Sequence, residues 1–212
     1  MAVFLTTYLS GKSSLLLTLF GLLNLQSGSI TIDSLSTATL PRSILRSHLN
    51  IIPQDPIIFP GSVRLNAIPS IPSIPLSEDE GIIAALKAVN IWDTISSRGG
   101  LDADMGKIPL SQGQKQLFGL ARALLRRDKS PILVLDEATS NFDHQTDDIM
   151  QRIIREEWKG KTIIAVVHKL NTVMDFDRIA VLERGRLVEF DAPGNLMKRE
   201  GGVFKGLWDS QI

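Results

Sequence analysis

The sequence predicts an α/β fold in which a mostly parallel sheet is interrupted by a helical insert. Two apolar runs, Ile132–Leu135 and Thr162–Val167, lack polar alternation, which is typical of strands buried on both faces of a parallel sheet. A helical pattern over about residues 143–158 separates them and supplies the crossover that parallel strands need. Because parallel strands end at one edge of the sheet, we expect the polar residues after each run to lie close together.

Composition excludes several other classes of protein. The chain has 212 residues, and its 23 basic residues balance its 23 acidic residues, so no basic surface for nucleic acid is expected. It contains no cysteine, which excludes disulfides, thiolate metal sites and cysteine nucleophiles. The apolar stretch Leu15–Leu25 is shorter than the roughly 20 residues of a membrane span, and the chain's start lacks the basic segment of a secretory signal.

The first elements follow the order strand, loop, helix. Ala2–Leu5 is a short apolar run, and Gly11, Lys12 and Ser13 precede the apolar segment LLLTLFGLL. This is the layout of a phosphate-binding loop, in which backbone N–H groups and the positive helix end surround phosphates, the lysine reaches the terminal ones and the serine holds Mg²⁺. The full pattern asks for glycine where Thr6 stands. An ordinary helix start capped by Ser13 is the alternative interpretation.

The next elements lead into a proline-rich connection. Gly28–Asp33 predicts a short half-buried strand, Pro41–Ser47 a brief helix, and Asn50–Pro53 a strand that leads into Gln54. On its own, a glutamine at the end of such a strand is interpreted as a surface residue. Six of the ten prolines lie between Pro53 and Pro75, and prolines at this density block helix and sheet pairing, so a surface connection is expected there.

The middle of the chain has helical patterns and lacks a convincing strand. Ser77 and Glu80 form a capping box ahead of a helix expected from about Glu78 to Ile95. A second helix is expected from Gly113 to about Leu125. We therefore divide a single domain into a core, a helical subdomain and a tail. The expected bounds are 1–54 and 130–190 for the core, about 55–129 for the helical subdomain, and 191–212 for the tail.

The start of the second helix is a candidate anion site. Ser111, Gln112 and Gly113 place a hydroxyl, free N–H groups and the positive end of a helix dipole at one point. The alternative is a serine that only caps the helix.

Two carboxylates and a histidine follow the buried strands. Asp136 and Glu137 come directly after the first strand and His168 after the second, which predicts that they share the sheet edge of the phosphate-binding loop. Interpreted singly, the carboxylates are solvated turn residues and the histidine is a loop residue. Further on, Glu183–Gly185 is expected to join two strands of a hairpin, and Trp208 to contact the core from a terminal helix.

Together, these motifs resemble the nucleotide-binding domain of ABC transporters, and in particular the second such domain of the C-subfamily, the multidrug-resistance-associated exporters. The resemblance covers nearly all of the chain and rests on the order and spacing of six elements. They are the Walker A remnant SGKSS at Ser10–Ser14, the Q-loop IIPQDP at Ile51–Pro56, the signature LSQGQ at Leu110–Gln114, the Walker B segment ILVLDE at Ile132–Glu137, the D-loop SNFD at Ser140–Asp143, and the switch residue His168.

The resemblance implies an ATPase with a P-loop NTPase core in the ABC ATPase fold. Asp136 and Ser13 would hold Mg²⁺, with Gln54 sensing the metal. Glu137 would be the general base that activates water for attack on the γ-phosphoryl group, and His168 would contact that phosphate. The implied contacts to bound ATP come from Ser10, Gly11, Lys12, Ser13 and Ser14.

The resemblance also implies that the signature acts on a different ATP. Ser111 and Gly113, with Gln112 and Gln114 beside them, would bind the γ-phosphate of an ATP held by a second nucleotide-binding domain in a head-to-tail pair. Asp143 would couple the two sites. The membrane-spanning part would lie on another chain or upstream, so a location on the cytosolic face of a membrane is expected, with no membrane span in this chain.

Two departures from the family pattern set expectations for affinity. Thr6 and Leu9 stand where such loops usually have glycine. Only eleven residues precede Lys12, so the family's adenine-stacking aromatic residue and first strands are expected to be missing. We therefore expect an amino-terminally truncated domain that binds ATP weakly as an isolated chain. The alternatives to an exporter motor are a non-catalytic remnant and a soluble ABC ATPase without a membrane partner.

Overall fold

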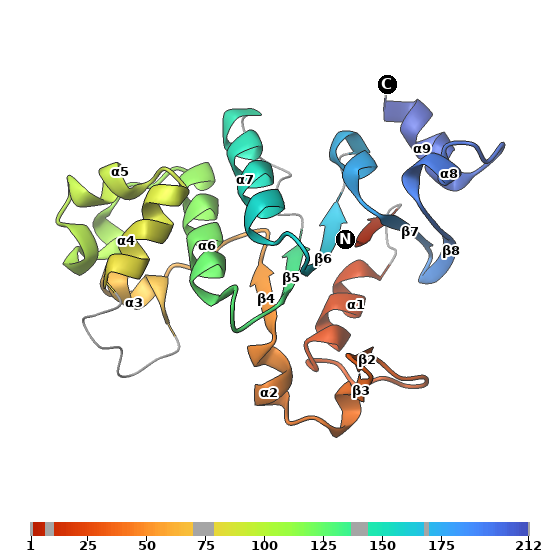
Figure 1. Cartoon of the computed structure of the whole chain (residues 1–212), viewed down its shortest axis with the longest axis horizontal. Helices are drawn as coiled ribbons and strands as arrows, with labels where there is room; N and C mark the ends of the chain where they lie inside the picture. The colour runs from red at the N-terminus through yellow and green to blue at the C-terminus, as the bar shows by residue number, and fades with distance from the viewer. Residues whose placement is uncertain (1, 7–10, 70–78, 137–143, 168–169, 212) are drawn as a thin grey trace.

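The computed structural model describes residues 2–6, 11–69, 79–136, 144–167 and 170–211. Within these ranges, six strands form one sheet, with helices on its two faces and a group of helices beyond one end (Figure 1). The strands of this sheet are β1 (Ala2–Thr6), β4 (Leu49–Ile52), β5 (Ile132–Asp136), β6 (Thr162–Val167), β7 (Arg178–Glu183) and β8 (Arg186–Asp191).

The sheet is mostly parallel, as the sequence predicts. Its order is β4-β5-β6-β1-β7-β8, and every neighbouring pair is parallel except β7 with β8. The expected hairpin joins these last two strands, and Arg184 and Gly185 turn the chain with φ values of 48° and 76°. Positive φ at two successive turn residues matches the right-handed twist of the flanking strands. The predicted fold class is confirmed.

Both faces of the central strands are buried. In β5, Leu133 and Leu135 belong to a core cluster that includes residues of α6 (Gln112–Arg126) and α7 (His144–Glu157). Val134, whose side chain points to the opposite face, packs with Leu16 of α1 (Lys12–Leu19). This two-sided burial is the physical reason why the run Ile132–Leu135 shows no polar alternation.

The prediction of one helix from Glu78 to Ile95 is wrong in its extent. It is two helices, α4 (Asp79–Ala88) and α5 (Trp92–Ser96), and Asn90 between them has φ 60°. The Asn90 N–H donates to the Lys87 carbonyl (2.9 Å) and the Ile91 N–H donates to the Leu86 carbonyl (3.0 Å). This is a Schellman end, in which a left-handed residue satisfies the last carbonyls of a helix, and the burial of Ile91 and Leu86 stabilises it.

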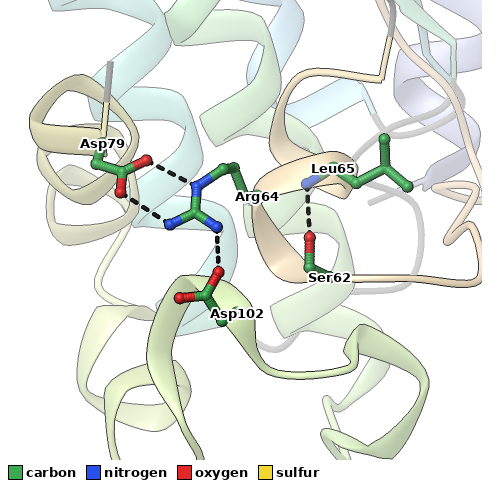
Figure 2. A network of polar contacts seen from close by, with 5 residues as sticks. All are labelled: Ser62, Arg64, Leu65, Asp79 and Asp102. Atoms are coloured by element: carbon green, nitrogen blue, oxygen red, sulfur yellow. Dashed lines mark hydrogen bonds and ion pairs between the residues drawn. The ribbon is translucent and has the colours of Figure 1, made fainter. Parts of the chain in front are cut away.

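One arginine side chain joins three helices of the helical region (Figure 2). Arg64 of α3 (Val63–Ala67) donates from Nε and Nη2 to the two carboxylate oxygens of Asp79 in α4, each at 2.8 Å. Its Nη1 pairs with Asp102 of η3 (Gly100–Asp102). The hydrogen bonds from Arg64 lower the pKa of the Asp79 carboxyl below its ordinary value. The same view shows Ser62 capping α3 by accepting the Leu65 N–H (3.2 Å).

The remaining elements refine the predicted boundaries. The strand expected at Gly28–Asp33 is limited to β2 (Thr31–Ile32), which pairs with β3 (Leu35–Ser36), while the expected helix at Pro41–Ser47 is confirmed as α2 (Arg42–Ser47). Trp208 packs on the core as expected, and its ring centroid lies 6.2 Å from the ring centroid of Phe204. Ser77 and residues 70–75 of the proline-rich connection lie outside the described residues. The described part of that connection contains α3 with Val63 and Ala67 buried, so the expectation of a surface connection without a helix is wrong there. The other elements are η1 (Thr37–Thr39), η4 (Met105–Lys107), η5 (Leu170–Asp175), α8 (Pro193–Leu196) and α9 (Val203–Gln211).

Candidate nucleotide-binding site

The carboxyl ends of β1, β5 and β6 meet at one edge of the sheet. Asp136, the last residue of β5, is opposite Val166 of β6, and Val166 is opposite Phe4 of β1. The arrows of β4, β5 and β6 point the same way in Figure 1. The segments that follow these strands contain predicted site residues that lie outside the described residues, namely Ser10, Glu137, Asp143 and His168.

The helix after β1 begins with the geometry of an anion site. Gly11 is the N-cap of α1 with φ 84°, a left-handed conformation that glycine adopts without strain. No side chain of the described residues caps this helix, so the alternative in which Ser13 acts as the cap is wrong. Ser13 and Ser14 are exposed, and the first turn has no acidic residue to offset the positive end of the helix dipole.

A buried leucine packs α1 against the sheet. Leu16 is 4% exposed and packs against Val134, in the middle of β5, and Val166, near the carboxyl end of β6. Lys12 is one helical turn before Leu16. This packing brings the amino end of α1 to the edge of the sheet where Asp136 ends β5.

The oxygen donors at this edge suit Mg²⁺. The Asp136 side chain is half-buried at the end of β5, and the Ser13 hydroxyl lies in the first turn of α1. In nucleotide sites Mg²⁺ takes one or two protein oxygens and completes its shell with phosphate oxygens and water. A carboxylate and a hydroxyl therefore fit the ion.

Gln54 follows β4 at the same edge. β4 pairs in parallel with β5, so the residues just beyond it lie beside the end of β5. The Gln54 side chain is exposed, as interpreted from the sequence. The main-chain carbonyl of Gln54 accepts a hydrogen bond from Nε2 of Gln116, and the carboxylate of Asp55 accepts one from Nε2 of Gln112 (3.0 Å).

The predicted signature forms the amino end of α6. Ser111 is the N-cap, and the helix begins at Gln112, one residue before the expected Gly113. Ser111 Oγ accepts the Gln114 N–H (3.1 Å) and Gln114 Oε1 accepts the Ser111 N–H (3.0 Å), which makes a capping box. The capping interpretation is therefore confirmed. It does not exclude anion binding, because the N–H groups of Gln112 and Gly113 have no acceptor within the helix.

The starts of α6 and α7 are packed together. A Cβ placed on Gly113 would lie 3.4 Å from Cγ2 and Oγ1 of Thr146, an ordinary contact distance, so the start of α6 lies directly beside α7. In Figure 1 both helices begin on the side toward which the parallel strands point. The structure thus brings the signature to the side of the sheet that holds Gln54 and Asp136.

Sequence reasoning missed the residues that join α6 to the segment after β4. Gln116 and Arg122 bind main-chain carbonyls of residues 54–66. The available signal was a polar residue on the apolar side of a helix, since Gln116 is flanked at helical spacing by buried positions.

None of the helices in the described ranges combines the length and the apolarity needed to cross a membrane.

Comparisons with known proteins agree on one family. The profile of a family described as ABC transporter matches residues 10–140. The chain is 46% identical over 203 residues to ABC multidrug transporter B of Aspergillus fumigatus, covering 96% of the chain and 14% of the relative. It is 45% identical over 201 residues to ATP-binding cassette sub-family C member 3 of Mus musculus, covering 93% of the chain and 13% of the relative.

A solved structure agrees with these sequence relatives. The fold matches a bacterial Atm1-family ABC exporter with ATP bound at a TM-score of 0.88 and 30% identity, covering 100% of this chain and 36% of that chain. The chain spans about 14% of the length of the curated relatives it matches. These matches confirm the predicted family and ATP as its ligand: the chain belongs to the ABC transporter family and is an ATP-binding domain of that family.

Proposed function

We propose that this chain hydrolyses ATP and that the reaction drives export of a substrate across a membrane. The observation that supports this best is the start of α1, where Gly11 has a positive φ and Leu16 packs against β5 and β6. A lysine, a helix amino end and Asp136 then lie at one sheet edge, which suits a nucleoside triphosphate. The relative named as a multidrug transporter supports the export part.

In the proposed site, Lys12 binds the terminal phosphates and the N–H groups of Ser13 and Ser14 bind phosphate oxygens, with Ser10 and Gly11 completing the loop. The Ser13 hydroxyl and the Asp136 carboxylate would hold Mg²⁺, with Gln54 at the end of β4 as a further contact. When bound, the ion would neutralise charge on the phosphates.

Glu137 is the proposed general base. It takes a proton from the water that attacks the γ-phosphorus, while the bond from that phosphorus to the bridging oxygen breaks and ADP leaves. His168 donates a hydrogen bond to the γ-phosphate and stabilises its charge in the transition state.

The proposed reaction needs two domains arranged head to tail. The signature binds the γ-phosphate of an ATP held by the other domain, and Asp143 couples the two sites. The partners are a second nucleotide-binding domain and the transmembrane domains of an exporter, which hold this chain on the cytosolic face of a membrane. The signature residues in this role are Ser111, Gln112, Gly113 and Gln114.

The proposed domain division follows the same reasoning. Residues 1–54 and 130–190 form the nucleotide-binding core, about 55–129 form the helical subdomain that carries the signature, and 191–212 form a tail. The described elements between Ile57 and Arg126 are helices, which supports this division.

Turnover of ATP with Mg²⁺ by the whole chain and by Glu137→Gln tests the proposed reaction. Loss of the base is expected to lower kcat by about 10²-fold to 10³-fold, because one transition-state contact is removed. Glu156→Gln, which changes an exposed carboxylate of α7, is the matched control and is expected to keep the wild-type rate.

A second candidate is a non-catalytic domain that binds ATP weakly. It is favoured by Thr6, which is the last residue of β1 and pairs with Leu182, where the phosphate-loop pattern asks for glycine. A wild-type rate no higher than that of Glu137→Gln would contradict hydrolysis and support this candidate.

A further inference from the structure

One side of α6 faces the chain segment that contains Gln54. The residues on this side are Gln112, Gln116, Gly119 and Arg122, at spacings of four, three and three. Such spacings put side chains on one face of a helix. Each of the four contacts residues 54–57, so the segment after β4 lies along α6 for nearly the whole length of that helix.

The contacts begin next to the signature. Gln112 Nε2 donates to the Asp55 carboxylate at 3.0 Å, and one turn later Gln116 Nε2 donates to the Gln54 carbonyl. A Cβ on Gly119 would lie 3.7 Å from Cβ and Cγ of Pro56, an ordinary contact distance, so the segment lies directly beside the helix here.

Arg122 completes the set. Its Nη1 donates to the Ile57 carbonyl (2.6 Å) and its Nε to the Asn66 carbonyl (2.6 Å), and its guanidinium lies 4.9 Å from the Phe118 ring centroid. Burial lowers the pKa of Arg122 to about 10, so the group stays charged at neutral pH. A half-buried cation bound to carbonyls loses these bonds if the segment shifts, which makes the arrangement rigid.

Asn66 extends this arrangement to Phe59. Asn66 Oδ1 accepts both the Arg122 Nη2 hydrogen (3.1 Å) and the Phe59 N–H (2.8 Å), and Asn66 Nδ2 donates to the Phe59 carbonyl (2.9 Å). The main chain from Gln54 to Phe59 is therefore held at both ends by bonds that lead to α6.

Gln116 is a buried polar residue on the side of α6 that faces the segment after β4. It is 3% exposed, and its Oε1 has no hydrogen-bond partner among the described residues. A buried oxygen without a donor costs about 1–3 kcal/mol, whereas an apolar side chain of similar size would avoid that cost. A bond to the Gln54 carbonyl needs a side-chain donor, which Gln116 supplies and an apolar residue of similar size lacks.

We propose that Gln116 and Arg122 are positioning residues that fix Gln54 relative to α6, so that Gln54 and the signature at Ser111–Gln114 move as one body. The functional part of this inference rests on the proposed ATPase activity. When the signature binds an ATP held by the other domain, Gln54 would shift with α6 relative to Ser13 and Asp136, the residues that would hold Mg²⁺. The two ends of this body thereby link the two ATP sites.

Hydrogen–deuterium exchange of the whole chain tests the mechanical part without nucleotide. Gln116→Met is expected to speed amide exchange in residues 54–59 by about tenfold, since it removes one bond worth about 1–1.5 kcal/mol. Arg122→Met, which removes three bonds, is expected to speed it by at least as much. Arg126→Met, at an exposed cation of the same helix, and Gln151→Met in α7 are the controls and are expected to leave that exchange unchanged. Unchanged exchange in both test variants would overturn the inference even if the chain hydrolyses ATP.

A double-mutant cycle tests whether Gln116 acts through Gln54. Gln116→Met is expected to lower kcat with KM for ATP unchanged, to keep the thermal midpoint, and to add no further loss in a Gln54→Ala background. A lower midpoint with additive losses in kcat would mean a merely structural role and would overturn the inference. Absence of turnover in the wild-type chain would count against the proposed function only, and the exchange result would then decide the inference.

Discussion

At the residue scale, the site depends on a few side chains and backbone conformations with specific physical roles. Gly11 turns the chain into α1 at a positive φ, Leu16 packs that helix on the sheet, and Gln116 donates a hydrogen bond to the main chain of Gln54. Sequence patterns identify the first of these as part of a motif. They do not identify Gln116, because a helical pattern shows which face is buried but not which segment covers it.

A residue-scale prediction concerns Asp79, whose pKa is lowered by its hydrogen bonds to Arg64. A carboxyl with a lowered folded-state pKa contributes stability above its ordinary pKa of about 3.9, and that stability is lost as pH falls through the folded-state value. Asp79→Asn is therefore expected to lower the urea midpoint at pH 6 and above, and this difference from wild type should shrink below about pH 4.

Urea unfolding curves between pH 6 and pH 3 measure this difference. Asp209→Asn, at an exposed carboxyl of α9, is the control and is expected to differ from wild type by the same small amount throughout. A difference for Asp79→Asn that does not change with pH would contradict the assigned role of Arg64.

At the scale of elements, prediction from sequence succeeds where one physical signal dominates. The expected strand Thr162–Val167 matches β6 in both bounds, because an unbroken apolar run between polar neighbours has few other solutions in a buried sheet. The expected helix at Glu78–Ile95 fails, because Asn90 ends a helix only when the residue after it can be buried against the last turn, as Ile91 is.

The break between α4 and α5 gives an element-scale prediction. Asn90→Gly is expected to raise the free energy of unfolding by up to about 1 kcal/mol, because glycine adopts φ 60° without strain, and Asn90→Ala to lower it by about 1 kcal/mol. Ala84→Gly, at an exposed position inside α4, is the matched control and should destabilise by about 1 kcal/mol. Denaturant unfolding measures all three, and equal stability of the glycine and alanine variants at position 90 would contradict the Schellman end.

At the scale of the whole molecule, the order of the strands brings distant segments of the chain to one edge. Lys12, Gln54 and Asp136 lie more than 40 residues apart from one another in the sequence, and the parallel pairing of β4, β5, β6 and β1 aligns the segments that contain them. The sequence predicts this edge because parallel strands leave little choice of topology. The roles of Glu137, His168 and Asp143 stay predictions, since these residues lie outside the described ranges.

A prediction at this scale concerns the polypeptide that carries the sequence. If the chain serves an exporter, an antibody to residues 191–212 should detect a band several times larger than 23.3 kDa in the membrane fraction of source cells. This expectation follows from relatives of which the chain covers only 14%. A band near 23.3 kDa confined to the soluble fraction would contradict the exporter role and favour the weakly binding domain.

The central claim is that Lys12 and the amino end of α1 bind the phosphates of ATP, and an equilibrium titration of the whole chain with ATP and Mg²⁺ tests it most directly. We predict saturable but weak binding, with Kd above about 100 µM, and affinity at least about tenfold lower in Lys12→Ala, since a charge-assisted contact is worth about 1.5–3 kcal/mol. Lys87→Ala, at an exposed lysine of α4, should bind like wild type. Equal affinity of the wild-type chain and Lys12→Ala would contradict the claim.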